Sequence, residues 1–324
     1  MLLSALAILV GLGLLVWSAD LFVEGASATA KNLGVSTLII GITIIGFGTS
    51  APEILISIFS VFDDTPDLAI GNALGSNIAN IGLILGITAL IMPLGIASRI
   101  LKREFPILII ASIILSWTLW DLQLDLIDGI VLLSSLFIAL IYLMRFGQST
   151  QDDVLSTEMD HEIPHNIPNT KALLLTLVGL LILVGSSKLL VWGAVNIATE
   201  LGVSELVIGL TIVALGTSLP ELAASIAGVK KNESDLVIGN VVGSNLFNSL
   251  AVIGIPAMMT DFSFSAIALN RDLSVTLCFT LALFLLAYLP KSSCCKLTRF
   301  KGGLLLLGFV LYQSLLYYQV TNQS

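Results

Sequence analysis

The chain has 324 residues, of which 56% are hydrophobic and only 11% are charged, and its mean hydropathy is +1.01. A soluble domain carries about 25% charged residues, so this composition excludes a soluble globular protein, and its abundant apolar residues exclude a disordered one. The formal net charge of −8 argues against a nucleic-acid partner, although charges on the two sides of a membrane must be counted separately. The sequence therefore predicts an all-α polytopic membrane protein whose surroundings are lipid.

Apolar runs separated by charges predict ten membrane-spanning helices. These are 2–19, 35–62, 68–92, 104–120, 126–146, 171–190, 203–229, 236–258, 272–289 and 302–318. The first run has no basic residues before it, so we expect a retained span and not a cleaved signal peptide. One long polar segment separates five spans from five. This division predicts a first five-helix repeat over 1–146, a cytosolic linker over 147–170 and a second five-helix repeat over 171–324.

Lysine and arginine residues decide the predicted orientation. With this span count, 12 of the 14 basic residues fall on the side opposite the N-terminus, and only Lys188 and Arg271 fall on the N-terminal side. Cytoplasmic loops of membrane proteins are enriched in Lys and Arg. Both termini are therefore expected outside the cytoplasm and the linker inside it.

The chain contains an internal repeat at a constant offset of 168 residues. VSTLIIGITIIGFGTSAPE (35–53) aligns with VSELVIGLTIVALGTSLPE (203–221), and IGNALGSNIAN (70–80) aligns with IGNVVGSNLFN (238–248). Across these segments and the residues between them, 24 of 46 positions are identical without gaps. Five predicted spans, an odd number, lie within the offset, so the second copy is expected to cross the membrane in the opposite direction. Inverted repeats of this kind are typical of secondary transporters, with the substrate site between the repeats near the midplane.

Glu53 and Glu221 are the only acidic residues expected well inside the spans, and they occupy equivalent positions of the repeat. Glu53 precedes Asp63 by 10 residues and Glu221 precedes Lys230 by 9, or about 15 Å and 14 Å along a helix. Both carboxylates are therefore expected near the middle of a hydrocarbon core about 30 Å thick. A carboxylate there costs several kcal/mol unless it is paired, hydrated or bound to a cation. A protonated Glu that donates one hydrogen bond between helices is the alternative.

Each glutamate ends a GTS-x-PE motif. Thr49 and Ser50 lie four and three residues before Glu53 and so share its helix face; Thr217 and Ser218 do the same in the second copy. The proline before each glutamate leaves a backbone carbonyl without its helical donor and favours a kink. A single hydroxyl in a membrane helix often serves only helix packing. Hydroxyl, carbonyl and carboxylate oxygens occurring together twice are the hard ligands that Ca²⁺ and Na⁺ prefer.

A second motif, GN-xx-GSN-xx-N, also occurs in both copies. It places Ser76 one helical turn before Asn80, and Ser244 one turn before Asn248. Its two glycines have the GxxxG spacing that lets helices approach closely, a signal that by itself usually indicates packing. Here we expect this spacing to seat the Ser and Asn face against the glutamate-bearing helix.

These two motifs, occurring twice and in the same order, resemble the alpha-repeats of the calcium/cation antiporter superfamily, the sodium/calcium exchanger group, in its compact prokaryotic form. The resemblance covers the whole ten-span chain. It implies cation exchange by alternating access in the plasma membrane (the inner membrane of a prokaryote), with the first helix of each half sliding as a gating pair. It implies that Glu53 and Glu221 are the principal ligands. Further oxygens are implied from Thr49, Ser50, Ser76, Asn80, Thr217, Ser218, Ser244 and Asn248.

The chain departs from the family pattern at one of these positions. Several calcium-transporting relatives have an Asp at the position of Asn248, whereas both Asn80 and Asn248 are amides here. The site therefore carries at most two negative charges, enough to neutralise one Ca²⁺ or two monovalent cations. The transported inorganic cations are substrates, and no cofactor is expected.

Exchange of Ca²⁺ for Na⁺ or H⁺ is the leading interpretation. Exchange of monovalent cations only (Na⁺/H⁺ or K⁺-dependent) is the runner-up, and a cation channel with the same carboxylates as its filter is a further alternative. An enzyme is not expected, because the chain has no HExxH motif and no His or aspartate pair inside the spans. The three cysteines predict no disulfide framework, and His161 and His165 in the linker are expected to be solvated.

Overall fold

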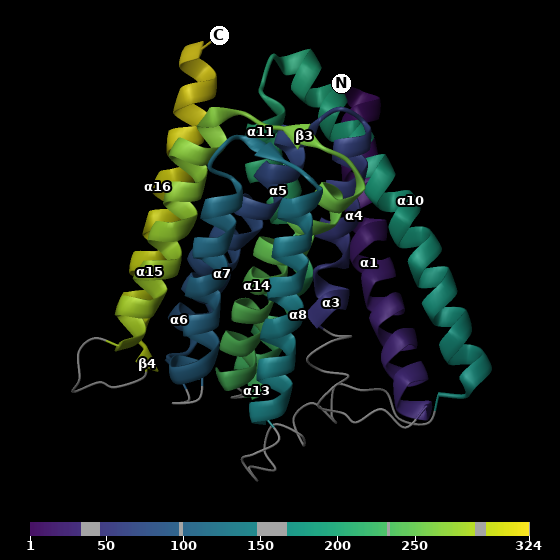
Figure 1. Ribbon diagram of the computed structural model, residues 1–324, viewed down its shortest axis with the longest axis vertical. Coiled ribbons are helices and arrows are strands. Elements are labelled where there is room, and N and C mark those ends of the chain that lie inside the picture. The colour runs from purple at the N-terminus through teal and green to yellow at the C-terminus, as the bar shows by residue number, and fades with distance from the viewer. Residues whose placement is uncertain (34–45, 97–99, 148–166, 232–233, 289–295, 324) are drawn as a thin grey trace.

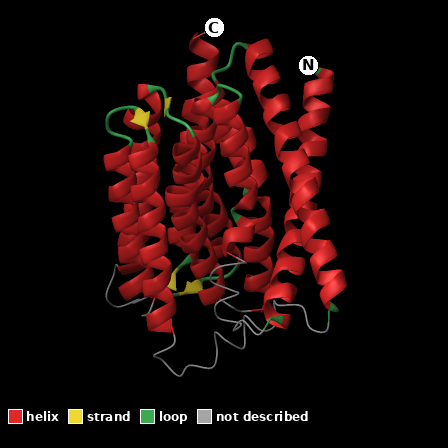
Figure 2. Ribbon diagram, turned by 45° about the vertical axis from the view of Figure 1, so that its right-hand side comes forward, coloured by secondary structure: helices red, strands yellow, loops and turns green. Residues whose placement is uncertain are grey.

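The computed structural model is a bundle of helices (Figure 1). It describes residues 1–33, 46–96, 100–147, 167–231, 234–288 and 296–323. Both ends of the chain lie at one end of the bundle, which we call the terminal face (Figures 1 and 2). The opposite end, where α8 ends and α10 begins, is the linker face.

The helices follow each other in two comparable series. The first half contains α1 (Leu2–Asn32), α3 (Gly46–Thr49), α4 (Ala51–Phe62), α5 (Pro66–Ala79), η2 (Asn80–Ile84), α6 (Leu85–Ile91), η3 (Ile100–Glu104), α7 (Phe105–Thr118) and α8 (Leu126–Gly147). The second half contains α10 (Asn169–Leu201), α11 (Glu205–Ile208), η4 (Gly209–Val213), α12 (Ala214–Thr217), α13 (Leu219–Lys231), α14 (Ser234–Met259), η5 (Ala268–Leu273), α15 (Ser274–Tyr288) and α16 (Arg299–Gln323). Segments labelled η are π-helical stretches within longer helices.

Two pairs of very short strands, which the sequence did not predict, join loops near the two ends of the bundle (Figure 2). Antiparallel pairs form between β1 (Leu94–Gly95) and β4 (Lys296–Leu297), and between β2 (Gln123–Leu124) and β3 (Phe262–Ser263). Each pair connects a loop of the first half to a loop of the second half, so the two halves are joined at both faces.

The prediction of an all-helical polytopic membrane protein with two repeats is confirmed. Among the described residues, eight helical segments are long and apolar enough to cross a membrane. The predicted span 35–62 begins with residues outside the described part of the chain and continues as α3 and α4. The predicted span 104–120 corresponds to the 14-residue α7, which η3 precedes.

The predicted lengths of the first helix of each half were too short. The predicted spans 2–19 and 171–190 are α1 and α10, with 31 and 33 residues. Asp20 and Lys188 therefore lie inside these helices, and Asp20 is a further acidic residue within a span. A long helix tolerates such a charge when the side chain reaches an aromatic ring or a polar region. The Lys188 Nζ atom lies 6.0 Å from the centre of the Phe59 ring. Because α10 continues to Leu201, Lys188 lies in the interior of the helix and not at the terminal face.

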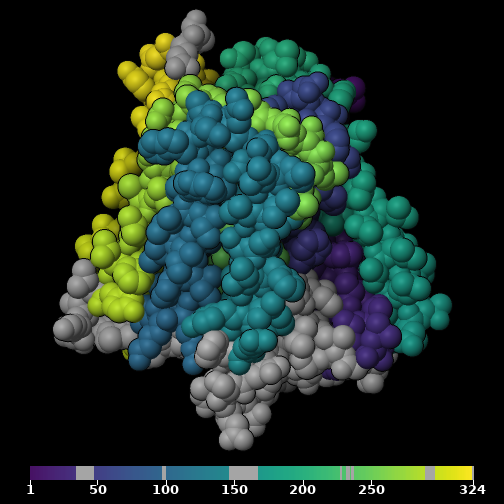
Figure 3. Space-filling view, in the orientation of Figure 1, coloured from purple at the N-terminus to yellow at the C-terminus, as the bar shows by residue number. Residues whose placement is uncertain are grey.

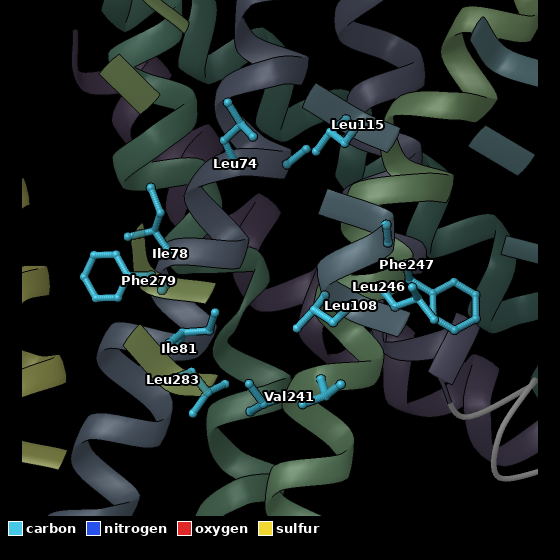
Figure 4. Close-up of a cluster of buried hydrophobic side chains, with 14 of the residues drawn as sticks. Leu74, Ile78, Ile81, Leu108, Leu115, Val241, Leu246, Phe247, Phe279 and Leu283 are labelled. Atoms are coloured by element: carbon cyan, nitrogen blue, oxygen red, sulfur yellow. The ribbon is translucent and has the colours of Figure 1, made fainter. Parts of the chain in front are cut away.

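The helices that carry the second motif form the centre of the bundle. In an 18-residue apolar stretch of Pro66–Ile91 and of Val237–Met259, 78% and 83% is buried, whereas in Leu126–Arg145 and Arg299–Asn322 only 22% of such a stretch is buried. Apolar side chains of α5, α7, α14 and α15 meet around this centre (Figure 4). The space-filling view shows α7 and α8 on the near face, α15 and α16 at one edge and α1 and α10 at the other (Figure 3). The peripheral helices expose large apolar residues, as contact with lipid requires.

The seam between α1 and α10 is antiparallel and closely packed at glycines. A Cβ atom added at Gly25 would lie 2.4 Å from the Thr176 nitrogen, and one at Gly179 would lie 2.5 Å from the Phe22 nitrogen. Gly11 and Gly193 approach the opposite helix in the same way. Under the offset of 168 residues, Gly11 corresponds to Gly179 and Gly25 to Gly193, so the seam has the inverted symmetry of the two halves.

We expect Gly25→Ala to destabilise the protein by about 1–3 kcal/mol, because the new methyl group collides with the backbone of α10. Gly13→Ala in the same helix is the matched control, since a Cβ there meets no atom within 4 Å. Thermal unfolding of both variants in detergent measures the difference. Equal midpoints for the two variants would contradict the close packing of this seam.

Candidate ion-binding site

Both GTS-x-PE motifs interrupt their helices, as the sequence predicts. The first span breaks at Ser50, between α3 and α4, and the second breaks at Ser218, between α12 and α13. The proline that follows each break cannot donate the hydrogen bond that would continue the helix. Glu53 and Glu221 consequently lie in the first turns of α4 and α13. The N-terminal end of a helix is a favourable position for an acidic side chain.

The two carboxylates are buried and have no compensating charge among the residues that the structure describes. Glu53 is 0% exposed and Glu221 is 1% exposed, and neither forms an ion pair with any residue that the structure describes. Both oxygens of Glu53 and the Oε2 atom of Glu221 accept no hydrogen bond in the described part of the chain. The Oε1 atom of Glu221 accepts one from the Ser244 hydroxyl at 3.5 Å. The two glutamates are also close enough to repel each other electrostatically when both are ionised.

Asp272 shows how this chain compensates a buried carboxylate elsewhere. It is 0% exposed, but its Oδ1 atom lies 2.6 Å from Arg271 Nε and accepts a hydrogen bond from the Tyr312 hydroxyl at 2.7 Å. A second guanidinium nitrogen of Arg271 donates to Oδ2 at 3.1 Å, and Arg271 also contacts Gln319. Carboxylate oxygens without a donor, as at Glu53 and Glu221, are therefore not a general feature of the buried acids that the structure describes. Such oxygens are of the type that binds a hard cation.

Most of the other predicted ligands are buried, as the glutamates are. Thr49 is partly buried, and the others are at most 3% exposed: Ser50, Ser76, Asn80, Thr217, Ser218, Ser244 and Asn248. The hydroxyls of Ser76 and Thr217, from different halves, lie 3.4 Å apart. In contrast, the side chains of Ser50, Ser218 and Asn248 have no hydrogen-bond partner among the described residues. The Oδ1 atom of Asn80 is also without a donor in this part of the chain.

The predicted role of the GxxxG spacing is confirmed in the first half. A Cβ atom at Gly71 would lie 2.5 Å from the Leu206 carbonyl oxygen, and one at Gly75 would lie 2.8 Å from the Leu210 Cα atom. Leu206 and Leu210 belong to α11 and η4, which lead into the break before Glu221. The absence of side chains at the two glycines therefore brings α5 directly against the span that carries the other half's glutamate.

An amide network that the sequence analysis did not single out joins the halves beside the site. Asn77 donates from Nδ2 to the Ser249 hydroxyl at 3.0 Å, and Asn80 donates from Nδ2 to Asn245 Oδ1 at 3.0 Å. Asn245 in turn donates to the Asn77 carbonyl at 3.4 Å. The signal for it was the third residue of GSN, which is Asn in both copies. These hydrogen bonds fasten α5 and η2 to α14.

The chemistry of the site favours a hard cation. Among the described residues, no group of three or more His, Cys, Asp and Glu side chains could hold a metal. Cys278 is exposed and unpaired, while His161, His165, Cys294 and Cys295 lie outside the described residues. The available ligands are thus two carboxylates with neutral hydroxyl and amide oxygens. Such ligands suit Ca²⁺ and alkali cations better than metals that prefer nitrogen or sulfur.

Comparison with known proteins shows similarity along the whole chain. A model of the family described as sodium/calcium exchanger protein matches residues 3–145 and 171–318. The putative antiporter CaxA of Alkalimonas amylolytica is 45% identical over 318 residues, which cover 98% of this chain and 99% of CaxA. The inner membrane protein YrbG of Escherichia coli K12 is 38% identical over 321 residues, which cover 98% of each protein.

The fold is similar to that of the sodium-calcium exchanger NCX_Mj. A structure of NCX_Mj soaked with Na⁺ and Ca²⁺ is 32% identical to this chain, with a TM-score of 0.65. The similarity covers 96% of this chain and 97% of NCX_Mj.

We expect Glu53→Gln and Glu221→Gln each to weaken Ca²⁺ binding by about tenfold or more, because each removes one of two charges that offset cation dehydration. Calorimetric Ca²⁺ titration of the purified variants measures this effect. Glu205→Gln, at the start of α11, is the matched control and should bind as the wild type does. Unchanged affinity in either of the first two variants would contradict the site.

Proposed function

This chain belongs to the sodium/calcium exchanger family of cation antiporters, and we propose that it exchanges Ca²⁺ for Na⁺ or H⁺ by alternating access. The observation that carries the proposal is the pair of buried glutamates, one from each half, of whose four carboxylate oxygens three have no donor among the described residues. In this proposal Glu53 and Glu221 are the principal ligands. The hydroxyl and amide side chains that surround them complete the coordination shell. The protein is a transporter and not an enzyme.

The identity of the ions is supported by charge and by similarity. Two carboxylates neutralise one Ca²⁺ or two monovalent cations, so a loaded site is neutral with either substrate. Neutrality matters because a net charge is costly in the low-dielectric middle of the membrane. The similar solved structures include those of NCX_Mj soaked with Na⁺ together with Sr²⁺ or Ca²⁺. The division into 1–146, a linker over 147–170 and 171–324 belongs to the same proposal, with α1 and α10 as the moving pair.

We further propose that the terminal face lies outside the cytoplasm of a prokaryotic inner membrane. Twelve of the 14 basic residues support this orientation, since they fall on the side opposite the termini. The similarity to an inner membrane protein supports the location. A reporter that is active only in the cytosol, fused after Ser324, should be inactive. Activity of this fusion would reverse the proposed orientation.

The transport proposal is tested with the purified protein in proteoliposomes. Uptake of ⁴⁵Ca²⁺ should require an outward gradient of Na⁺ or of H⁺ and should vanish when neither is present. The gradient, Na⁺ or H⁺, that supports calcium uptake identifies the counter-ion. Calcium flux without any opposing cation would indicate a channel, and Na⁺/H⁺ exchange without Ca²⁺ flux would indicate the monovalent antiporter.

We expect exchange by the wild-type protein to be electroneutral, because the loaded site is neutral with one Ca²⁺ or two monovalent cations. Calcium uptake should therefore not change when a K⁺ diffusion potential is imposed with valinomycin. Asn248→Asp is the matched variant, since it adds a third carboxylate at a side chain with no partner among the described residues. At alkaline pH, where this carboxylate is ionised, uptake by the variant should depend on the potential. Potential-dependent uptake by the wild type would contradict the two-charge site.

A further inference from the structure

Equivalent serine and asparagine side chains of the two halves are bonded differently. In the first half, Asn72 on α5 donates from Nδ2 to the Glu53 carbonyl at 3.2 Å and to the Ser57 hydroxyl at 3.4 Å. Its Oδ1 atom accepts a hydrogen bond from the Thr217 hydroxyl at 3.4 Å. Ser57 and Asn72 are both 0% exposed. Asn72 thus connects α4 and α5 to a candidate ligand of the other half.

The counterparts in the second half are Ser225 on α13 and Asn240 on α14, each 168 residues later. The Ser225 hydroxyl and the Asn240 Nδ2 atom are buried and have no hydrogen-bond partner among the described residues. Buried polar atoms without partners are rare in native structures, and each one calls for an explanation. Because the residues are identical in both halves, their types cannot explain the difference.

Helix packing, like the hydrogen bonds of the Ser–Asn pairs, differs between the two halves. On the terminal side, α4 packs against both α10 and α14. Under the repeat, α1 is the counterpart of α10, and the counterpart of α14 is the segment that contains α5, η2 and α6. In the described part of the chain, α13 packs against η2 and α6 but makes no more than marginal contact with α1. Apolar side chains of α4 and α10, including Ile56 and Val191, belong to one buried cluster. Among the described residues, the glutamate-bearing helix of the first half is therefore packed against the first helix of the opposite half, whereas that of the second half is not.

We propose that the two Ser–Asn pairs are alternating latches of the transport cycle. Ser57 and Asn72 hold the terminal side closed in this structure. When the halves exchange conformations, Ser225 and Asn240 form the equivalent hydrogen bonds and hold the linker side closed, while the first pair separates. Inverted repeats permit such an exchange of roles around a fixed site. The inference rests on the proposed alternating access. These four residues are positioning residues, because they determine from which face of the protein a cation reaches its ligands.

The test measures how often the α4–α10 seam opens. Val191→Cys on α10 serves as the reporter, because Val191 is 0% exposed in the apolar cluster that it shares with Ile56 of α4. The background has Cys278, Cys294 and Cys295 replaced by Ser. The rate of maleimide alkylation is measured on the purified protein in detergent, where both faces are accessible. Ser57→Ala should raise this rate about two- to tenfold, the shift expected when one neutral hydrogen bond is lost from one of two states. Ser225→Ala should lower it, because the opposite state loses its latch.

Two controls separate a latch from a general loss of packing. Ser60→Ala removes another buried α4 hydroxyl, which donates only to the Ile56 carbonyl of its own helix at 2.8 Å, and should leave the rate unchanged. The double variant Ser57→Ala/Ser225→Ala should return the rate toward that of the parent. Changes of the same sign in the two single variants, or equal effects of Ser57→Ala and Ser60→Ala, would overturn the proposal. The assay needs no transported ion, so opposite shifts without calcium uptake would retain the latches and reject the proposed substrate.

Discussion

Two buried carboxylates in membrane-spanning segments, with no basic partner among the described residues, constrain the rest of this structure. Such a group is tolerated only where its charge is met by a cation, a proton or dense polar surroundings. The chain meets this requirement with helix breaks beside Glu53 and Glu221 and with hydroxyls and amides in the facing helices. The buried ion pair of Asp272 and Arg271 shows that the same chain can neutralise an acid permanently where nothing has to be exchanged. The contrast between this permanent compensation and the carboxylates of Glu53 and Glu221 supports the proposed site more than burial alone does.

Much of this arrangement could be predicted from the sequence, because it follows from local rules. A proline before each glutamate predicts the break, and a repeat containing an odd number of spans predicts the inversion. The lengths of α1 and α10 could not be predicted, since the first apolar run was read as ending before Asp20 and Lys188 was assigned to the terminal side of its span. Nor could the network of Asn77, Asn80 and Asn245, because amide pairs depend on the register between helices that lie far apart in the sequence.

The difference between the halves is a case in which sequence has no information to offer. Ser57 and Ser225 occupy identical positions of the repeat, yet only the first has a hydrogen-bond partner among the described residues. In the proposed cycle, the two halves exchange conformations. The sequence at these equivalent positions is the same, so the intrinsic backbone preference does not favour either conformation. Tertiary packing alone selects one of them. The polar network between α5 and α14 is compatible with this exchange, because it lies between the halves and can remain intact while peripheral helices move.

Because α1 and α10 are long, their tilt is expected to depend on the thickness of the bilayer. At 1.5 Å per residue, their 31 and 33 residues extend about 46 Å and 50 Å, well beyond a hydrocarbon core of about 30 Å. Their glycine seam joins them into one body, and α10 leans away from the central helices toward the linker face (Figure 1). A thicker membrane favours a more upright pair and a thinner one a more inclined pair. Lipid acyl-chain length therefore changes the tilt of α1 and α10, and α10 packs against α4. Rates of ion exchange in bilayers of different thickness would measure this mechanical coupling.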